Sequence, residues 1–537
     1  MAAALLYLPE QRVSPLFSND SFQYLSAAHH LRSDYRYATS LVHYDTERMH
    51  GVIPAPLTWF PPGYPMAIAA LSITGLDLEK SALAISVACF ALVAAGLWRL
   101  MQMLETGLWA ARAAVVCWLL SSQALLYSVS ALSESMFVAL GLASLLLVLR
   151  TGYTGPGARS AAMWLGAVAL AGVSYWVRYA GIIWAGAFGI LLSAHLVARG
   201  SKRRPALGVA ALAALLVALV IAPLMVRNHR LVGDWRGSNN SEARSPASLV
   251  VAETVRSACD LVLGAGTRQD LLAPVALLGF GAGGLCLLGF RRRTGSSADR
   301  PKEAVRMRAN VLIVLAAAAM YAAGIVAVCF NSMLVCAPRY LLPVLPHAIA
   351  LAVWGASWTI RRVPPGTAPR TVALALAMCA LAGYAGANII SCRLPVRDRF
   401  LETERALAEP DASGQSLRLL VERELAPGEV IAATNGQATG YVLGHPALCL
   451  AEQPYTTLAW TEAELRKEMA RFGASLLLVF RSGSLDQVVE MSPTVRALAG
   501  GRSAPWLHPV AFNRHVYVYH AQPQAPQNLS SERLEAR

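Results

Sequence analysis

A series of long apolar segments constrains the fold of this chain more than any other feature of its sequence. A helix needs roughly 20 apolar residues to cross the hydrocarbon core of a bilayer, and about ten segments reach or approach that length. With 55% hydrophobic and only 15% charged residues, the chain is also too apolar for a soluble protein. The sequence therefore predicts a polytopic α-helical membrane protein with about ten complete spans. The predicted spans cover residues 81–101, 109–129, 134–150, 161–177, 179–198, 206–226, 271–290, 309–330, 341–360 and 371–391.

Two further apolar runs are too short to cross a membrane. The run 62–75, about 14 residues long, is predicted to form a re-entrant or surface-lying helix. At the start of the chain, Met1–Leu8 is apolar and is followed by Pro9, but it is too short for the core of a signal peptide. We expect Met1–Leu8 to be the outer end of a truncated first transmembrane helix that is missing from this sequence.

The net charge of +14 is unevenly distributed, because basic residues gather in alternate short loops between the predicted spans. This is the positive-inside pattern of membrane proteins, so we expect these loops in the cytoplasm and no nucleic acid partner. The first loop (9–61) and everything after Cys392 then face the outside. Frequent Arg and Ala with only four Lys residues hint at a bacterial protein, and we expect the bacterial inner (plasma) membrane. The basic residues of the cytoplasmic loops are Arg99, Arg112, Arg150, Arg159, Arg199, Lys202, Arg203, Arg204, those within 291–308, Arg361, Arg362 and Arg370.

The polar region after Cys392 has the pattern of an α/β domain. Strands are predicted at 429–433, 474–480 and 515–520. A helix is predicted at Thr461–Phe472, because Thr461 and Glu464 form a capping box at its start. The chain is thus predicted to consist of a transmembrane domain (1–392) that includes the extracytoplasmic first loop (9–61), an extracytoplasmic α/β domain (393–520) and a disordered tail (521–537).

The first loop carries Trp, Tyr and Phe residues together with acids, which is unusual for a mere connection. Asp20 follows Asn19 where a helix is expected to start, and the amides of a first helical turn favour a carboxylate. A role as a helix cap is the alternative. The remaining acids of the loop (Asp34, Asp45 and Glu47) are expected to be solvated, and the spacing of its histidines (His29, His30, His43 and His50) matches no metal-ligand pattern.

Several charged residues are expected at the outward ends of the spans. Glu134 begins one span, with an N-terminal cap as the alternative role. Three arginines, Arg178, Arg227 and Arg339, have no acidic residue within four positions, and Tyr340 adds a hydroxyl beside Arg339. A guanidinium offers paired donors to phosphate oxygens, so these arginines predict a phosphate site. The alternative is an arginine that snorkels to the interface and only fixes helix depth.

Other classes of membrane protein find little support. The predicted spans have no Asp or Glu in their interiors and the chain shows no internal repeat, which argues against a secondary transporter. There is no P-loop sequence for nucleotide-driven transport. The nine cysteines lack CxxC spacing, and a disulfide among those expected outside (Cys259, Cys336, Cys392 and Cys449) stays open.

In their order along the chain, these motifs resemble the GT-C superfamily of integral-membrane glycosyltransferases. The resemblance is to the bacterial relatives of protein O-mannosyltransferases and lipid A aminoarabinose transferases (glycosyltransferase family 39-like), and it spans the whole chain as an architecture. Many members carry two adjacent acids where this chain has Asn19-Asp20, so the involvement of a divalent metal stays open. The motifs are Asn19-Asp20, Pro61-Pro-Gly-Tyr64-Pro65, Ser133-Glu134-Ser135, Arg178-Tyr179-Ala-Gly, Arg227-Asn228 and Arg339-Tyr340-Leu-Leu-Pro343.

The resemblance implies transfer of a sugar from a polyprenyl-phosphate-linked donor to an acceptor on the outer face, where the acceptor is a glycan, a lipid or a protein. It implies an inverting reaction with Asp20 as the general base. Glu134, Arg178, Arg227, Arg339, Tyr340 and Tyr64 would bind the substrates. The alternative function is a non-catalytic lipid-binding transporter or flippase with an accessory outer domain.

Overall fold

The structure is a computed structural model that describes residues 15–44, 46–49, 51–153, 158–198, 203–237, 245–264, 302–332, 336–392, 398–451, 456–481 and 492–522. The chain divides into two compact units. The helical unit comprises Met1–Pro15 and Phe60–Val396, and the sheet unit comprises Leu16–Trp59 and Arg397–Arg537. Most of the first loop therefore packs with the C-terminal region, whereas the sequence grouped it with the membrane helices. The reason is a strand within the loop, described below, that pairs with a strand of the C-terminal sheet.

Six helices of the described residues are long and apolar enough to cross a membrane. A bent pair, α5 (Leu108–Leu120) and α6 (Ser122–Ser128), brings the number to seven if it counts as one span. The expectation of about ten spans is thus reduced to six or seven among the residues described. The six are α4 (Leu78–Met103), α8 (Ala158–Val177), Leu207–Val232 of α10 (Arg203–Val232), Val305–Phe330 of α13 (Lys302–Phe330), the run Pro338–Arg362 that contains α14 (Pro338–Leu341) and α15 (Leu345–Arg362), and α16 (Ala368–Cys392).

The missing spans have identifiable causes. The predicted span 109–129 bends by 62° at Ser121, whose side chain accepts a hydrogen bond from the backbone N–H of Ala124 and so starts a new helix. Helix α7 (Glu134–Arg150) has only 17 residues, and the apolar part of α9 (Gly181–Ala198) is Gly181–Val197. The predicted span 271–290 lies outside the described residues.

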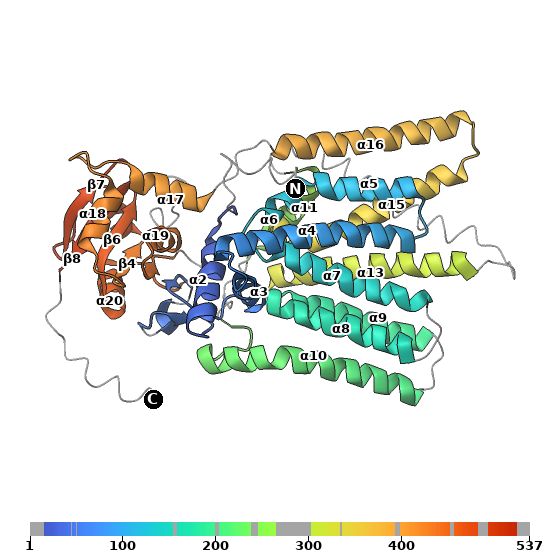
Figure 1. The fold of residues 1–537 in the computed structure, drawn as a ribbon, viewed down its shortest axis with the longest axis horizontal. Coiled ribbons are helices and arrows are strands. Elements are labelled where there is room, and N and C mark those ends of the chain that lie inside the picture. The colour runs from blue at the N-terminus through green and yellow to red at the C-terminus, as the bar shows by residue number, and fades with distance from the viewer. Residues whose placement is uncertain are drawn as a thin grey trace. The chain divides into compact units, whose positions relative to one another are not determined.

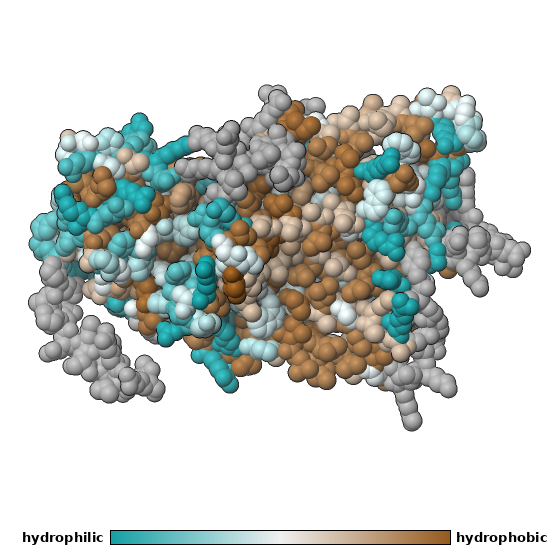
Figure 2. Space-filling model, in the orientation of Figure 1, coloured by the Kyte–Doolittle hydropathy of each residue, from teal (hydrophilic) through white to brown (hydrophobic). Residues whose placement is uncertain are grey.

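The long helices of the helical unit run roughly side by side (Figure 1). Helix α7 packs on α4 and on α8, and α8 also packs on α9 and α10. Small residues allow close approach. A Cβ atom at Gly141 of α7 would lie 2.9 Å from Nε1 of Trp184 on α9, so only glycine fits there. Figure 2 shows apolar residues covering much of the visible face of these helices. Such a broad apolar surface suits contact with lipid and indicates an integral membrane protein.

Short helices complete the helical unit. Helix α3 (Gly63–Ser72) occupies most of the run 62–75, and with 10 residues it is too short to cross a bilayer, as the sequence predicted. Helix α11 (Ala247–Leu263) packs on both α13 and α14.

The sheet unit contains a mixed six-stranded sheet with the strand order β2-β5-β4-β6-β8-β7. Strands β2, β5, β4 and β6 are parallel, and β8 and β7 are antiparallel to their neighbours. Strand β2 comes from the first loop, and its Leu41 is paired with Ala447 of β5. The strands are β2 (Leu41–Val42), β4 (Val430–Ala433), β5 (Ala447–Cys449), β6 (Ala474–Phe480), β7 (Leu507–Phe512) and β8 (Val516–Ala521).

The predicted elements of the C-terminal region are confirmed: β4, β6 and β8 lie where strands were expected, and the helix Glu462–Phe472 (α20) begins with the Thr461–Glu464 capping box. The further helices are α2 (Asn19–Ser33), α17 (Arg399–Ala408), α18 (Leu417–Glu424), α19 (Gly436–Leu443) and α22 (Pro493–Ala499). The core beside the sheet contains Trp460, Leu465, Met469, Leu477 and Tyr519.

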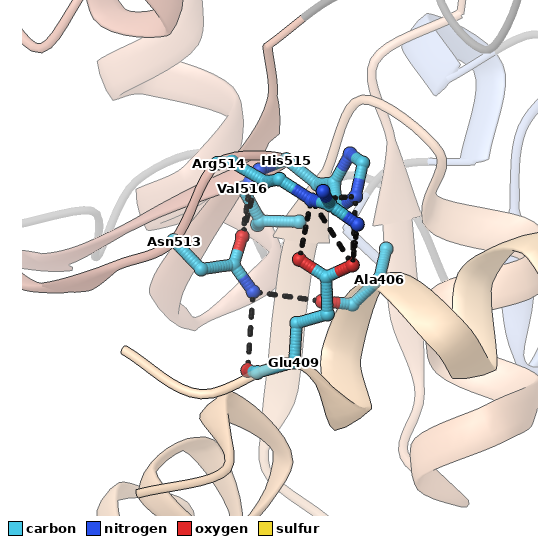
Figure 3. A network of polar contacts seen from close by, with 6 residues as sticks. All are labelled: Ala406, Glu409, Asn513, Arg514, His515 and Val516. Carbon is cyan, nitrogen blue, oxygen red and sulfur yellow. Dashed lines mark hydrogen bonds and ion pairs between the residues drawn. The ribbon is translucent and has the colours of Figure 1, made fainter. Parts of the chain in front are cut away.

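The end of α17 is attached to the turn between β7 and β8 (Figure 3). The side-chain amide of Asn513 donates to the backbone oxygen of Ala406 at 2.8 Å, which satisfies a carbonyl at the helix end. Arg514 binds the Glu409 carboxylate with its Nε at 2.8 Å, and Nε2 of His515 lies 3.1 Å from the same carboxylate. The hydrogen bond from Arg514 is the main cause that lowers the pKa of Glu409. This contact fixes α17 on the sheet.

Candidate functional site

Asp20 lies in the first turn of α2, as the sequence predicted. The N-cap is Ser18, whose backbone N–H donates to Oγ of Ser21 at 3.0 Å. The N-cap position therefore belongs to Ser18, with Ser21 completing the capping box, and Asp20 lies within the first turn. Tyr44 is the second residue after β2, and its hydroxyl lies 3.5 Å from Oδ1 of Asp20.

Helix α2 is held in place by both polar and aromatic contacts. Gln23 donates from Nε2 to the backbone oxygen of Leu41 in β2 at 2.8 Å, in a fully buried position. Near the start of the helix, the rings of Phe17 and Phe22 stack at 5.4 Å, and both approach Tyr441 of α19. The helix start that carries Asp20 is thus anchored on regular elements of the sheet unit rather than on a mobile loop.

Tyr44, whose hydroxyl lies near the carboxylate of Asp20, packs against two other rings. Tyr44 stacks on Trp59 with ring centroids 4.4 Å apart and nearly parallel planes (6°). His43 meets Tyr44 edge-on at 4.4 Å. Burial lowers the pKa of His43 to about 4, and the negative charge of Asp20 only partly opposes this shift. His43 is therefore neutral near pH 7, so it contributes no positive charge beside Asp20.

His30 and Asp34 of the first loop form local structural contacts. Nδ1 of His30 lies 2.9 Å from Oδ2 of Asp34, and Nε2 of His30 lies 2.7 Å from Oγ of Ser40. Hydrogen bonds from Ser33 and His30 lower the pKa of Asp34. Among the described residues, no group of three or more His, Cys, Asp or Glu side chains could hold a metal ion. Asp45 and His50 lie outside the described residues.

In the helical unit, Glu134 and Arg178 form an ion pair between the start of α7 and the residue after α8. Nη1 of Arg178 lies 2.6 Å from Oε1 of Glu134 and donates to Oγ of Ser133 at 3.2 Å. Glu134 is only 1% exposed. Arg178 therefore has an acidic partner that its neighbours in the sequence do not reveal, and Glu134 holds an arginine in addition to starting a helix.

Tyr340 lies beside two of the predicted arginines. The guanidinium carbon of Arg178 is 5.8 Å from the centroid of the Tyr340 ring, and that of Arg339 is 5.1 Å away. Nη2 of Arg339 also donates to the Tyr340 hydroxyl at 3.3 Å. Glu134, Arg178, Arg339 and Tyr340, which we call the arginine cluster, are thus brought together from three separate segments.

Tyr127 of α6 belongs beside the arginine cluster and was not identified from the sequence. Its backbone oxygen accepts a hydrogen bond at 3.1 Å from Oγ of Ser135, the residue after Glu134. The sequence predicted that Tyr127 lies inside one continuous span. In the structure, the bend at Ser121 divides this span, and Tyr127 lies on the second helix, α6.

Arg227 lies on α10 and contacts a different set of residues. Its Nη1 donates to Oδ1 of Asn228 at 3.4 Å, and Nδ2 of Asn228 donates to the hydroxyl of Tyr179 at 3.0 Å. Tyr179 directly follows Arg178 in the sequence. The hydrogen bond between Asn228 and Tyr179 therefore involves the residue next to one member of the arginine cluster. The part of α10 that precedes Arg227 lines an apolar groove of about 560 Å³ between α8, α9 and α10. Ile221 and Met225 are among its lining residues.

Tyr64 is fully buried in the helical unit. Its hydroxyl lies 3.1 Å from Oγ of Ser86 and 3.3 Å from the backbone oxygen of Ala82, both on α4. Ser86 in turn donates to the backbone oxygen of Ser130 at 3.1 Å. The hydroxyl of Tyr64 thus joins α3 to α4 and to the segment before α7.

Solved structures with a similar fold cover nearly the whole chain. The apo structure of ArnT from Cupriavidus metallidurans matches with a TM-score of 0.58 at 14% identity, over 97% of this chain and 98% of ArnT. The structure of the same protein bound to undecaprenyl phosphate matches with a TM-score of 0.57, 14% identity and the same coverage.

The archaeal oligosaccharyltransferase AglB from Archaeoglobus fulgidus matches with a TM-score of 0.55 at 12% identity, over 98% of this chain and 74% of AglB. This chain therefore shares the fold of ArnT and of the oligosaccharyltransferase AglB. No family model and no curated protein matches its sequence. The resemblance of the architecture that the sequence predicts is thereby confirmed at the level of the fold.

Proposed function

We propose that this chain is a GT-C membrane glycosyltransferase that moves a sugar from a polyprenyl-phosphate-linked donor to an acceptor on the extracytoplasmic face. The observation that carries the proposal is the arginine cluster, in a chain whose fold matches ArnT over almost its full length. That ArnT binds undecaprenyl phosphate, and the AglB structure contains a dolichol-phosphate, supports a polyprenyl phosphate as the ligand here.

In the proposed reaction, Asp20 acts as the general base. Its carboxylate takes the proton of an acceptor hydroxyl, and the acceptor oxygen attacks the anomeric carbon of the donor sugar. The bond between that carbon and the phosphate oxygen breaks from the opposite side, so the configuration inverts and polyprenyl phosphate leaves. A correctly placed base contributes about a hundred- to ten-thousand-fold to such a step.

The arginine cluster is proposed to bind the phosphate of the donor. Two guanidinium groups and one carboxylate leave it with one net positive charge, which matches the single negative charge of a phosphodiester. As the sugar leaves, the phosphate gains a second negative charge, which a fixed guanidinium stabilises more strongly than the first. Glu134 holds the guanidinium of Arg178 in a defined position and so reduces the cost of orienting it.

The apolar groove is proposed to bind the isoprenoid chain of the lipid carrier, and Arg227 to contribute to the binding of its phosphate. The groove is lined mainly by aliphatic side chains and glycines of α8, α9 and α10, together with Ser193 and Met225, which suits an isoprenoid chain. Arg227 is two residues from Met225 of the groove lining and carries the charge expected near a phosphate. Tyr64 would then support the site indirectly, by holding α3 against α4.

The proposal is tested with the purified protein and a polyprenyl-phosphate sugar labelled in the sugar. Membrane lipids and surface glycans from a strain without this protein serve as the source of acceptor. We expect release of polyprenyl phosphate together with label in the acceptor fraction, and neither with the Asp20→Asn variant. Label that moves between leaflets of a vesicle without any cleavage of the donor would instead support a lipid transporter.

A further inference from the structure

Arginines from three helices gather at one end of the helical unit, around an unusual residue after α4. The backbone N–H of Thr106 donates to the backbone oxygen of Met101 at 3.2 Å, and that of Glu105 donates to the oxygen of Gln102 at 3.0 Å. These two hydrogen bonds form a Schellman motif, whose left-handed position normally belongs to glycine. Here it belongs to Glu105, with a φ of 56°, although a side chain makes this conformation costly. A gain outside the helix end should therefore offset this cost.

Glu105 holds an arginine from each of two other helices. Nη2 of Arg306, near the start of α13, lies 2.8 Å from Oε1 of Glu105. Nη1 of Arg361, near the end of α15, donates to the backbone oxygen of Glu105 at 3.1 Å. In addition, Nδ2 of Asn310 on α13 donates to the backbone oxygen of Met103 at 2.8 Å. Glu105 thus fixes two guanidinium groups close to each other where α4, α13 and α15 meet.

Two further arginines lie over tryptophan rings on the adjoining helices. The guanidinium carbon of Arg112 on α5 is 4.9 Å from the centroid of the Trp109 ring, and that of Arg362 is 3.9 Å from the centroid of the Trp358 ring. Helix α5 begins three residues after Glu105 and packs on α15. Trp109 is 78% exposed, and both arginines are exposed. Exposed tryptophan is typical of the level of the lipid headgroups in a membrane.

We propose that this end of the helical unit binds the headgroup of an anionic phospholipid of the cytoplasmic leaflet. Four arginines and one glutamate leave it with three net positive charges, which complement an anionic headgroup. A guanidinium also offers paired donors to phosphate oxygens. The choice of leaflet rests on the cytoplasmic orientation that the arginine-rich loops predict. We call Glu105 and the four arginines (Arg112, Arg306, Arg361 and Arg362) the headgroup site.

A phospholipid uses features of this surface that a soluble anion would leave unused. Figure 2 shows apolar residues along the helices of this unit and hydrophilic residues at their end on the right of the view. The apolar surface includes the exposed side chains of Val116 on α5 and Val372 on α16, two helices that pack together. Acyl chains can lie along these helices while the headgroup contacts the arginines, and Trp109 suits the boundary between the two.

Native mass spectrometry of the purified full chain, in a neutral detergent with added lipid, tests the proposal. The parent protein should bind phosphatidylglycerol more tightly than phosphatidylcholine. The double variant Arg112→Gln/Arg362→Gln should bind phosphatidylglycerol roughly 25-fold more weakly, since an arginine near an anionic surface contributes about fivefold. Both side chains are exposed, so the unfolding temperature without added lipid should stay at the parental value. Equal affinity of the parent for the two lipids would overturn the proposal.

The matched control is Arg159→Gln/Arg230→Gln, which removes the same charge elsewhere on the helical unit. Arg159 lies in the first turn of α8 and Arg230 in the last turn of α10, and both are exposed. This variant should keep the parental affinity for phosphatidylglycerol, and an equal loss in the two double variants would contradict a defined site.

A competition experiment separates a phospholipid from a free anion. Sodium phosphate, compared with sodium chloride at equal ionic strength, should not displace phosphatidylglycerol from the parent protein. Displacement by phosphate alone would assign the headgroup site to a soluble anion and overturn the proposal. Neither experiment involves transfer of a sugar, so failure here leaves the proposed function untouched.

Discussion

The surroundings of Asp20 and the arginine cluster lie in different units of the fold and are built from different kinds of contact. Asp20 stands at the start of a helix, among stacked aromatic rings and beside a histidine that is neutral near pH 7. The arginine cluster instead joins segment ends through an ion pair of 2.6 Å and two cation–π contacts. A half-buried carboxylate suits the removal of a proton, whereas fixed guanidinium groups suit the binding of an anion. On this ground we propose that the region of Asp20 acts on the acceptor and that the arginine cluster binds the donor phosphate.

The largest expected effect is on the region of Asp20. Asp20→Asn should lower turnover by about a hundred- to ten-thousand-fold, since it removes the basic oxygen. Its thermal stability should stay at the parental level, because Ser18 and Ser21 build the cap. The matched control is Asp34→Asn on the same segment, whose carboxylate pairs with His30, and it should keep parental turnover. Equal loss in both variants would remove the special role of Asp20.

A change within the arginine cluster should act on donor binding. Arg339→Lys keeps the charge but loses the forked donor geometry, so donor affinity should fall roughly tenfold or more, as expected for a lost charged hydrogen bond. Arg339→Ala should be weaker still. Donor affinity is measured for both variants at equal amounts of folded protein. Parental affinity of the Lys variant would show that Arg339 only snorkels and fixes helix depth.

The ion pair between Glu134 and Arg178 should contribute measurably to the free energy of unfolding. Removing one partner of a buried pair costs about 3–5 kcal/mol, because the other charge stays buried. Glu134→Gln should therefore lower the unfolding temperature of the helical unit. Adding Arg178→Gln to it should restore part of the loss, which a double-mutant cycle measures. Strictly additive losses would indicate that the two side chains do not interact.

The smallest effect concerns pH and the sheet unit. Burial lowers the pKa of His43 to about 4 from its ordinary value of 6.5, so the folded state binds this proton more weakly than the unfolded state. The associated stability is present above about pH 6.5 and is lost as the pH falls toward 4. His43→Phe should flatten this part of the stability profile measured by thermal unfolding. An unchanged slope between pH 6.5 and 4 would exclude His43 as its source.

Features with a local cause could be predicted from the sequence. The neighbours of Asp20 predicted that it lies in the first turn of a helix. The spacing of Thr461 and Glu464 predicted the start of α20. Strand β6 was predicted from a mostly apolar run that contains five consecutive apolar residues, 476–480. In each case the physical signal, a cap or a hydrophobic pattern, lies within a few residues of the element that it specifies.

Features that depend on distant parts of the chain could not be predicted. Strand β2 has two residues, and only its pairing with β5, about four hundred positions away, reveals it. The ion pair between Glu134 and Arg178 likewise requires that α7 and α8 pack together. The bend at Ser121 was missed because a side-chain hydrogen bond, rather than a loss of hydrophobicity, ends the helix there.

The most direct test of the account compares donor binding with donor cleavage in the same two variants. For Asp20→Asn, the dissociation constant for a non-cleavable polyprenyl-phosphate sugar analogue should equal that of the parent, while single-turnover cleavage of the true donor is lost. For Arg339→Lys, the dissociation constant should rise, and cleavage at saturating donor should be affected less than in Asp20→Asn. If Asp20→Asn instead cleaves the donor at the parental rate, or loses donor binding as strongly as Arg339→Lys, the proposed division between a base and a phosphate site is wrong.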